Sequence, residues 1–161
     1  MQLETRQFGM LEIQDEQIIH IPKGILGFEG LEKFVLVDNP ECAPFRWLQC
    51  IEAPNLAFIV VSPVIFFPEY RVAVHSKEVA DIDVERPEDV EIFVIVTIPP
   101  QFEHMSANLQ GPILINTKSM KAKQLVLTNS EYTVQHPVLE EVQKRTSSIV
   151  SGEVTTAQLS G

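Results

Sequence analysis

Histidine and cysteine are the residue types in this chain best suited to hold a metal ion or to activate a nucleophile. The four histidines show no HxH or HxxxH spacing, so a metal site would have to be assembled wholly by the fold. Cys42 and Cys50 are too far apart for a CxxC pair, and we expect two reduced thiols. No GxSxG nucleophile elbow is present. We therefore predict a protein that is not an enzyme and has no metal, cofactor or catalytic group.

Three glycines, Gly24, Gly27 and Gly30, follow an apolar run and invite comparison with a phosphate-binding loop. The dinucleotide-binding fingerprint needs a different spacing and a helix directly after it. We interpret these glycines as residues that allow unusual backbone angles in a wide turn.

The charge of the chain limits the kinds of partner that it can attract. The formal net charge is −10, so most approaches to a nucleic-acid backbone would be repulsive and we expect no direct nucleic-acid binding. Seven acids lie between Lys77 and Glu91, against only Lys77 and Arg86. One hypothesis is that this run steers a basic protein partner; the alternative is a solvated acidic face. The hypothesis rests on four carboxylates: Glu78, Asp81, Asp83 and Glu85.

Two further segments are candidates for contact with another protein. Phe66, Phe67 and Tyr70 lie beside prolines, where a loop could expose an apolar anchor; the alternative is that Phe66 and Tyr70 belong to the core. The second segment, 108–112, is bounded by glycine and proline just before a predicted strand. We expect Asn108, Leu109 and Pro112 to contribute to a partner surface there; the alternative is that Asn108 and Asn116 cap turns and Gly111 meets a backbone requirement.

Short apolar runs broken by Pro, Gly and Asn predict a mainly β protein, a small antiparallel β-barrel-like domain with minor helical elements. The first hairpin is predicted to pair 10–13 with 17–21. The segment 70–74 could be a strand or a short helix, and Arg86-Pro87-Glu88-Asp89 could open a helical turn. The run 92–98 is the most apolar of the chain and predicts a central strand covered on both faces. Further strands are predicted at 34–37, 46–51, 57–61, 112–116, 124–127 and 132–134.

The last part of the chain differs from the rest. From Pro137 onward, helix formers with Leu139 and Val142 three residues apart predict a short helix, and rising Ser, Thr and Gly content then predicts a mobile tail. We therefore divide the chain into a β domain over 1–137 and a helix and tail over 138–161. The N-terminus has no signal peptide pattern and no segment has the apolar length of a membrane span, so we expect a cytoplasmic protein that does not contact the membrane.

Three segments in order give the chain a specific resemblance. They are IPKGILGFEGLEKF over 21–34, FRWLQCIEAPNLAFIVVSP over 45–63 and SANLQGPILINTKSMKAKQLVL over 106–127. Together they resemble the FliW family of flagellar assembly factors, and the likeness runs from about Phe8 to Pro137. The resemblance implies a small barrel-like β fold, in agreement with the strand pattern.

The resemblance also implies a function. Proteins of the FliW type bind CsrA, a basic dimeric RNA-binding translational repressor, and relieve its repression of flagellin synthesis; they also bind flagellin, which displaces the repressor. An acidic chain suits a basic partner of this kind. Two alternatives remain open: a flagellin chaperone without CsrA regulation, and a small barrel enzyme that binds a flavin or another ligand in an apolar pocket.

Overall fold

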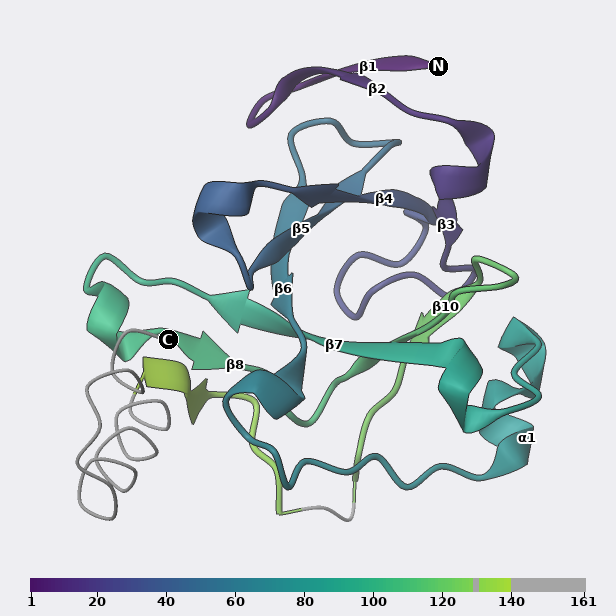
Figure 1. The fold of residues 1–161 in the computed structure, drawn as a ribbon, viewed down its shortest axis with the longest axis vertical. Coiled ribbons are helices and arrows are strands. Elements are labelled where there is room, and N and C mark those ends of the chain that lie inside the picture. Colours follow the sequence, from purple (N-terminus) through teal and green to yellow (C-terminus); the bar gives the residue numbers. More distant parts are fainter. Residues whose placement is uncertain (129–130, 140–161) are drawn as a thin grey trace.

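The computed structural model describes residues 1–128 and 131–139, and within them the regular secondary structure is mainly β, joined by turns and long irregular segments (Figure 1). One short helix, α1, spans Ser76–Val79. Six 3-10 helices lie at Asp15–Gln17, Pro40–Cys42, Pro63–Ile65, Ala80–Ile82, Pro87–Asp89 and Phe102–His104 in this part of the chain. The strands are β1 Gln2–Thr5, β2 Gly9–Glu12, β3 Ile19–His20, β4 Lys33–Asp38, β5 Arg46–Cys50, β6 Ala57–Val61, β7 Val90–Thr97, β8 Ser106–Ala107, β9 Ile113–Asn116, β10 Ala122–Gln124 and β11 His136–Pro137.

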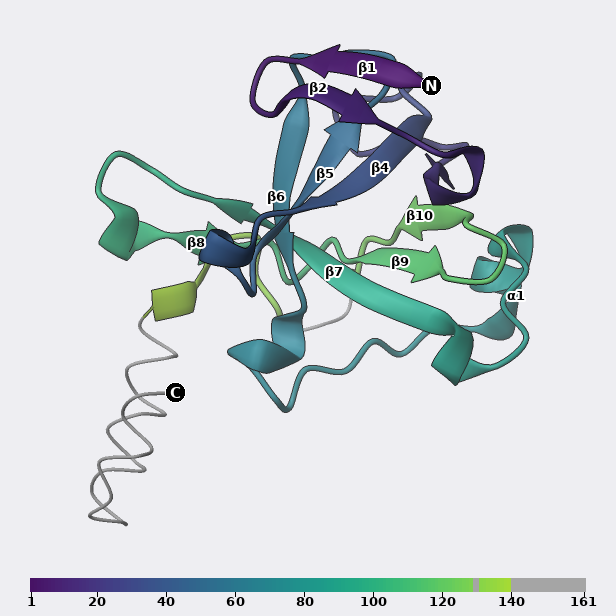
Figure 2. The same ribbon diagram turned by 45° about the horizontal axis from the view of Figure 1, so that its top comes forward.

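The main sheet is antiparallel and curls into a nearly closed barrel. Its order is β10-β9-β7-β6-β5-β4-β3, with β8 beside β7 and β11 beside β8. The two ends of the order meet where the N–H of His20 donates to the carbonyl oxygen of Met120 at 2.8 Å, next to a parallel bridge between His20 and Lys121. Figure 2 shows the sheet turning sharply between β6, which runs with β5 and β4, and β7, which crosses the molecule with β9. The predicted barrel-like fold is confirmed.

Strand β7 is the central element, as its apolar run predicts. It pairs with β6, β8 and β9. The side chain of Phe93 packs into the cluster inside the barrel with Phe34 and Leu48, whereas Val94 points to the opposite face and packs in a second cluster. Both faces of the strand are therefore covered.

The predicted first hairpin is wrong. Residues 10–13 pair upstream with β1, in a register that places Leu3 opposite Leu11, and β3 pairs with β4 instead. The 3-10 turn Asp15–Gln17 separates the two strands; its Gln14 and Gln17 cap each other and redirect the chain. The β1–β2 hairpin then lies over β4, where Leu3, Ile13 and Val35 form a cluster of their own.

The predicted last strand at 132–134 is also wrong. The strand is β11, which pairs with β8, while the ring of Tyr132 lies 4.5 Å from that of Tyr70. The segment 70–74, for which the sequence allows either a strand or a short helix, forms neither. The 3-10 helix Pro87–Asp89, with proline at its start, confirms the predicted turn. The predicted C-terminal helix and tail fall mainly on 140–161, outside the described residues.

Candidate protein-binding surfaces

The acidic run 77–91 is anchored to the end of the sheet by its few apolar side chains. Val79 and Ile82 are buried in a cluster with Leu114 of β9. The side-chain amide of Asn116 donates to the carbonyl oxygen of Ile82 at 2.9 Å. Because the valine and isoleucine face inward, Asp81 between them faces solvent, whereas Asp89 at the end of the run is buried.

Three carboxylates of the run are paired with lysines from other parts of the chain, and Asp89 lies 3.1 Å from the ammonium of Lys118. Asp81 lies 3.2 Å from the ammonium of Lys123 and 3.3 Å from that of Lys23. Asp83 lies 2.9 Å from the ammonium of Lys121. Partial burial raises the pKa of Asp81, but the hydrogen bonds from Lys123 and Lys23 outweigh it and hold the pKa below the ordinary value. The sequence shows a basic turn at 118–123 but does not show that it folds against the acids.

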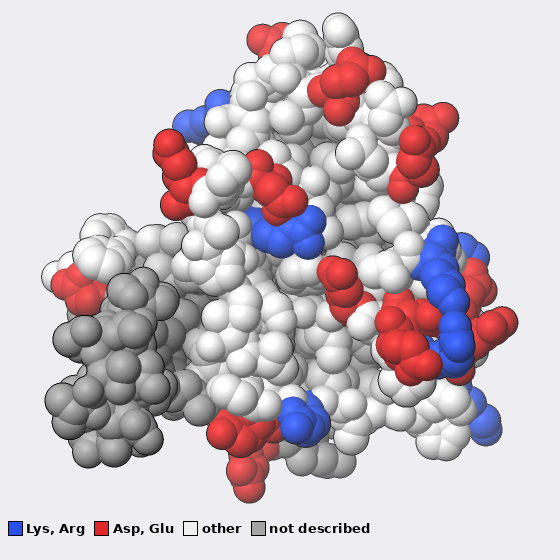
Figure 3. All heavy atoms as spheres, in the orientation of Figure 1, with Lys and Arg blue, Asp and Glu red and all other residues white. Residues whose placement is uncertain are grey.

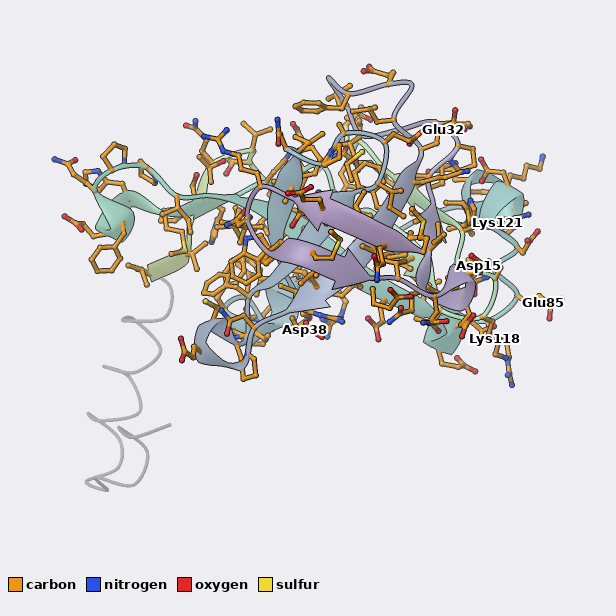
Figure 4. The ribbon with its side chains drawn as sticks, turned by 90° about the horizontal axis from the view of Figure 1, so that it is seen from above. Asp15, Glu32, Asp38, Glu85, Lys118 and Lys121 are labelled. Atoms are coloured by element: carbon orange, nitrogen blue, oxygen red, sulfur yellow. The ribbon has the colours of Figure 1, made fainter. Side chains whose placement is uncertain are left out.

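These ion pairs with lysines determine which carboxylates of the acidic run can attract a basic partner from a distance. Glu78 and Glu85 are exposed and form none of the ion pairs found among residues 1–128 and 131–139. Figure 3 shows acidic and basic atoms intermingled over α1 and the neighbouring turns, and Figure 4 shows Glu85 at the same end of the molecule as Lys118 and Lys121. Of the four predicted steering residues, Glu78 and Glu85 are therefore the two whose carboxylates are not held in an ion pair within the described residues.

The aromatic residues around position 66 lie mostly inside the protein. Phe66 is 1% exposed and Tyr70 is 3% exposed, and both pack in the second cluster with Leu109, which is fully buried. The hydroxyl of Tyr70 donates to the carbonyl oxygen of Leu109 at 2.7 Å. The core interpretation holds for Phe66 and Tyr70, and Leu109 likewise packs inside the protein.

Other side chains of the same segment do reach the surface. Phe67 is half-buried, with its ring 5.2 Å from that of His136. Val64 and Ile65 are 48% and 50% exposed. Prolines flank this segment in sequence, but only the packing decides that the valine and isoleucine face outward. Sequence reasoning did not single out Val64.

The loop 108–112 is built as a capped turn. The side-chain oxygen of Asn108 accepts hydrogen bonds from the backbone N–H groups of Gln110 at 3.1 Å and Gly111 at 3.0 Å. The side chain of Asn116 caps the next turn, where it accepts from Lys118 N at 2.9 Å. Pro112 is buried. Turn capping, the alternative for both asparagines, is what the structure shows.

A single glutamine joins this loop to the glycine loop. The amide nitrogen of Gln124 donates to the carbonyl oxygen of Gly111 at 2.9 Å, and its amide oxygen accepts from Leu26 N at 2.8 Å. Gly24 has a φ of +70°, in agreement with the expectation of unusual backbone angles. The glycine loop exposes two large apolar side chains: Leu26 is 69% exposed and Phe28 is 39% exposed.

No group of three or more His, Cys, Asp or Glu side chains within the described residues could hold a metal ion. Both cysteines are free thiols, as expected. No helix in the described part of the chain is long and apolar enough to cross a bilayer. The structure thus defines a barrel-like antiparallel β protein whose surface combines intermingled acidic and basic side chains with a few exposed apolar ones.

Comparison with known proteins gives the particular family. The model of the FliW protein family matches residues 2–139. The chain is 42% identical over 142 residues to the flagellar assembly factor FliW of Treponema denticola, which covers 88% of this chain and 96% of that protein. It is 42% identical over 138 residues to the same factor of Bacillus subtilis, covering 86% and 96%. This chain belongs to the FliW family of flagellar assembly factors.

A solved structure agrees with this assignment. The crystal structure of a flagellar assembly factor FliW superposes with a TM-score of 0.80 at 33% identity, covering 86% of this chain and 96% of that one. The expected family resemblance and fold are both confirmed.

Proposed function

We propose that this chain is a cytoplasmic flagellar assembly factor that binds the translational repressor CsrA and relieves its repression of flagellin translation. Flagellin is the second partner and competes with the repressor, so that partner exchange reports the amount of unassembled flagellin. The chain acts by binding and catalyses no reaction. The observation that carries the proposal is the family match over residues 2–139.

The charge of the molecule supports a basic partner. The net charge of −10 favours a basic RNA-binding protein over the RNA itself. The side chains of Glu78 and Glu85 are exposed and take part in none of the ion pairs of the described residues, so both carboxylates remain open to a basic partner.

Calorimetric titration of the full chain tests the proposal. The protein is titrated with purified CsrA, with purified flagellin, and with CsrA after saturation by flagellin. We expect saturable binding to each partner alone and loss of CsrA binding once flagellin is bound. Binding to flagellin alone would identify a chaperone without regulation. Binding to neither, together with a copurifying chromophore, would indicate the ligand-binding barrel instead.

A further inference from the structure

Strand β6 pairs with only the second half of β7, from Val94 to Val96, and leaves the first half of β7 without this neighbour. The register places Ile59 opposite Val96 and Val61 opposite Val94. The next pair on the same face as Val61 and Val94 would place Pro63 opposite Ile92, but proline has no N–H to donate and here opens the 3-10 helix Pro63–Ile65. From Val90 to Phe93, β7 therefore has β9 along one edge, and no described strand pairs with the other (Figure 2).

Backbone groups of β7 point toward this open edge. The carbonyl oxygens of Asp89 and Ile95 accept hydrogen bonds from Thr117 N and Asn108 N, each at 2.9 Å, on the side of β8 and β9. Hydrogen-bonding groups alternate between the two edges of a strand. The N–H and C=O of Ile92 therefore point to the opposite, open edge. The N–H of Val90, which shares that direction, is already bonded to Pro87 O.

A groove of about 530 Å³ runs along this edge. Its apolar lining includes Pro44, Pro63 and the two exposed side chains Val64 and Ile65. Unpaired ladder groups beside apolar side chains match the requirements of an extended peptide, which bonds through its backbone and places alternate side chains in the groove.

Arg46 and Glu91 line the groove, and Asp38 pairs with Arg46 from outside the lining. The guanidinium of Arg46 lies 5.6 Å above the ring of Phe93 and is paired with Asp38 and, at 3.9 Å, with Glu91. Two carboxylates thus accompany one guanidinium, and the side chain of Glu91 remains 54% exposed. A second copy of this chain would bring the same excess of negative charge to the edge, so like charges oppose pairing between copies.

We infer that the open edge of β7 binds an extended segment of a partner protein by strand addition, and that this segment carries alternating apolar residues together with lysine or arginine. The inference rests on the proposed function, in which the chain acts by binding other proteins. Beyond the proposed function, the inference specifies that the bound segment is extended, that it carries apolar and basic residues, and that it lies beside Ile92.

Amide hydrogen exchange of the full chain, followed by NMR, tests strand addition. The probes are CsrA, flagellin and a synthetic peptide of alternating Val and Lys or Thr residues, with a control peptide of the same composition that is N-methylated on alternate amides. We expect the Ile92 amide to exchange freely in the isolated protein and to slow at least about tenfold on binding. The Glu91 and Phe93 amides, which face β9, should be protected in both states. The N-methylated peptide should give no protection.

The outcomes separate this inference from the proposed function. Protection of Ile92 by the peptide, together with no binding of CsrA or flagellin, would support strand addition and overturn the proposed partners. Binding of CsrA or flagellin without slower exchange at Ile92, and none with the peptide, would overturn strand addition and leave the proposed function standing. Protection of Ile92 in the free protein would also overturn strand addition by a partner. Protection that increases with protein concentration would indicate that a second copy covers the edge. Protection that does not depend on concentration would indicate a segment of the same chain.

Variants of the groove provide a second test. Replacing Val64→Ser and Ile65→Ser together removes the apolar side chains without opening the core, because both are about half exposed. We expect the affinity for the peptide, or for the partner that protects Ile92, to fall about tenfold. The matched control replaces Val126→Ser and Val134→Ser, which are 56% and 54% exposed and do not line the groove. Equal losses in both pairs would overturn the inference.

Discussion

The hydroxyl of Tyr70 and the carbonyl oxygen of Leu109 form a buried hydrogen bond of 2.7 Å between segments 39 residues apart. It joins the segment that follows β6 to the turn that follows β8. Because both groups lie away from water, each depends on the other for its hydrogen bond.

Tyr70→Phe should therefore destabilise the protein without altering its shape. The substitution leaves the Leu109 carbonyl buried without that donor, and we expect a loss of about 1–3 kcal/mol in the free energy of unfolding. Urea unfolding followed by circular dichroism measures the loss. The matched control is Phe102→Leu, on a ring that is 61% exposed and should change stability by less than about 0.5 kcal/mol. An unchanged midpoint for Tyr70→Phe would show that water replaces the hydroxyl.

Tyr70 should also make stability fall at alkaline pH. Burial raises the pKa of Tyr70 above its ordinary value of 10.0, and the nearby Tyr132 adds a smaller contribution in the same direction. The folded state therefore retains this proton where the unfolded chain has lost it. The contribution is complete below about pH 10 and declines progressively at higher pH. Unfolding midpoints from pH 8 to 11 should fall less steeply for Tyr70→Phe than for the natural chain; parallel curves would contradict the assignment.

Gly111→Ala should destabilise the turn, although the backbone of Gly111 does not have a positive φ. A Cβ at this position would lie 2.9 Å from the amide nitrogens of both Asn108 and Gln124. Either the Asn108 cap or the Gln124 bridge must shift, at a cost of about 1–3 kcal/mol. Thermal unfolding measures the cost. The double variant Gly111→Ala with Gln124→Ala should lose less than the sum of the two single losses, because one of the two close contacts is then absent.

Phe66 and Ile65 should respond very differently to truncation, although they are neighbours. Phe66 is 1% exposed and Ile65 is 50% exposed. Phe66→Ala should reduce the free energy of unfolding by about 3–5 kcal/mol. Ile65→Ala should reduce it by less than about 1 kcal/mol. Denaturant unfolding of the two variants compares them directly, and similar losses would mean that Phe66 is not a core residue.

Charge reversal of Glu78 and Glu85 should slow association with CsrA. These carboxylates lack the lysines that pair with Asp81 and Asp83. For the variant Glu78→Lys with Glu85→Lys, we expect the association rate at low salt to fall about tenfold, the dissociation rate to change less than about twofold, and the salt dependence to flatten. Stopped-flow kinetics at several salt concentrations measures these rates.

The control for this experiment carries the same change in net charge elsewhere. Glu4→Lys with Glu103→Lys alters two exposed carboxylates outside the acidic run. Equal effects of the two double variants would show that net charge, and not the acidic face, governs association. An unchanged association rate for Glu78→Lys with Glu85→Lys would end the steering hypothesis.

The sequence by itself determined the strands that are long enough to show their own pattern. The runs that became β4, β5, β6, β7 and β9 are apolar, rich in β-branched or aromatic residues, and bounded by Pro, Gly or Asn. Such patterns are local, so they can be recognised without knowledge of the partner strand. The family resemblance follows from the same segments, because their glycines and prolines hold the turns between strands.

Only the tertiary structure decided the relationships that join distant segments. The strand β3 has two residues, and its pairing with β4 instead of β2 depends on where the intervening loop returns. Asp81 and Lys123 are 42 residues apart, so nothing local indicates that they meet. Whether Phe66 points inward and Ile65 outward follows from the 3-10 turn that Pro63 begins opposite Ile92. Local propensity sets the elements, whereas side-chain burial and charge pairing depend on which elements the fold brings together.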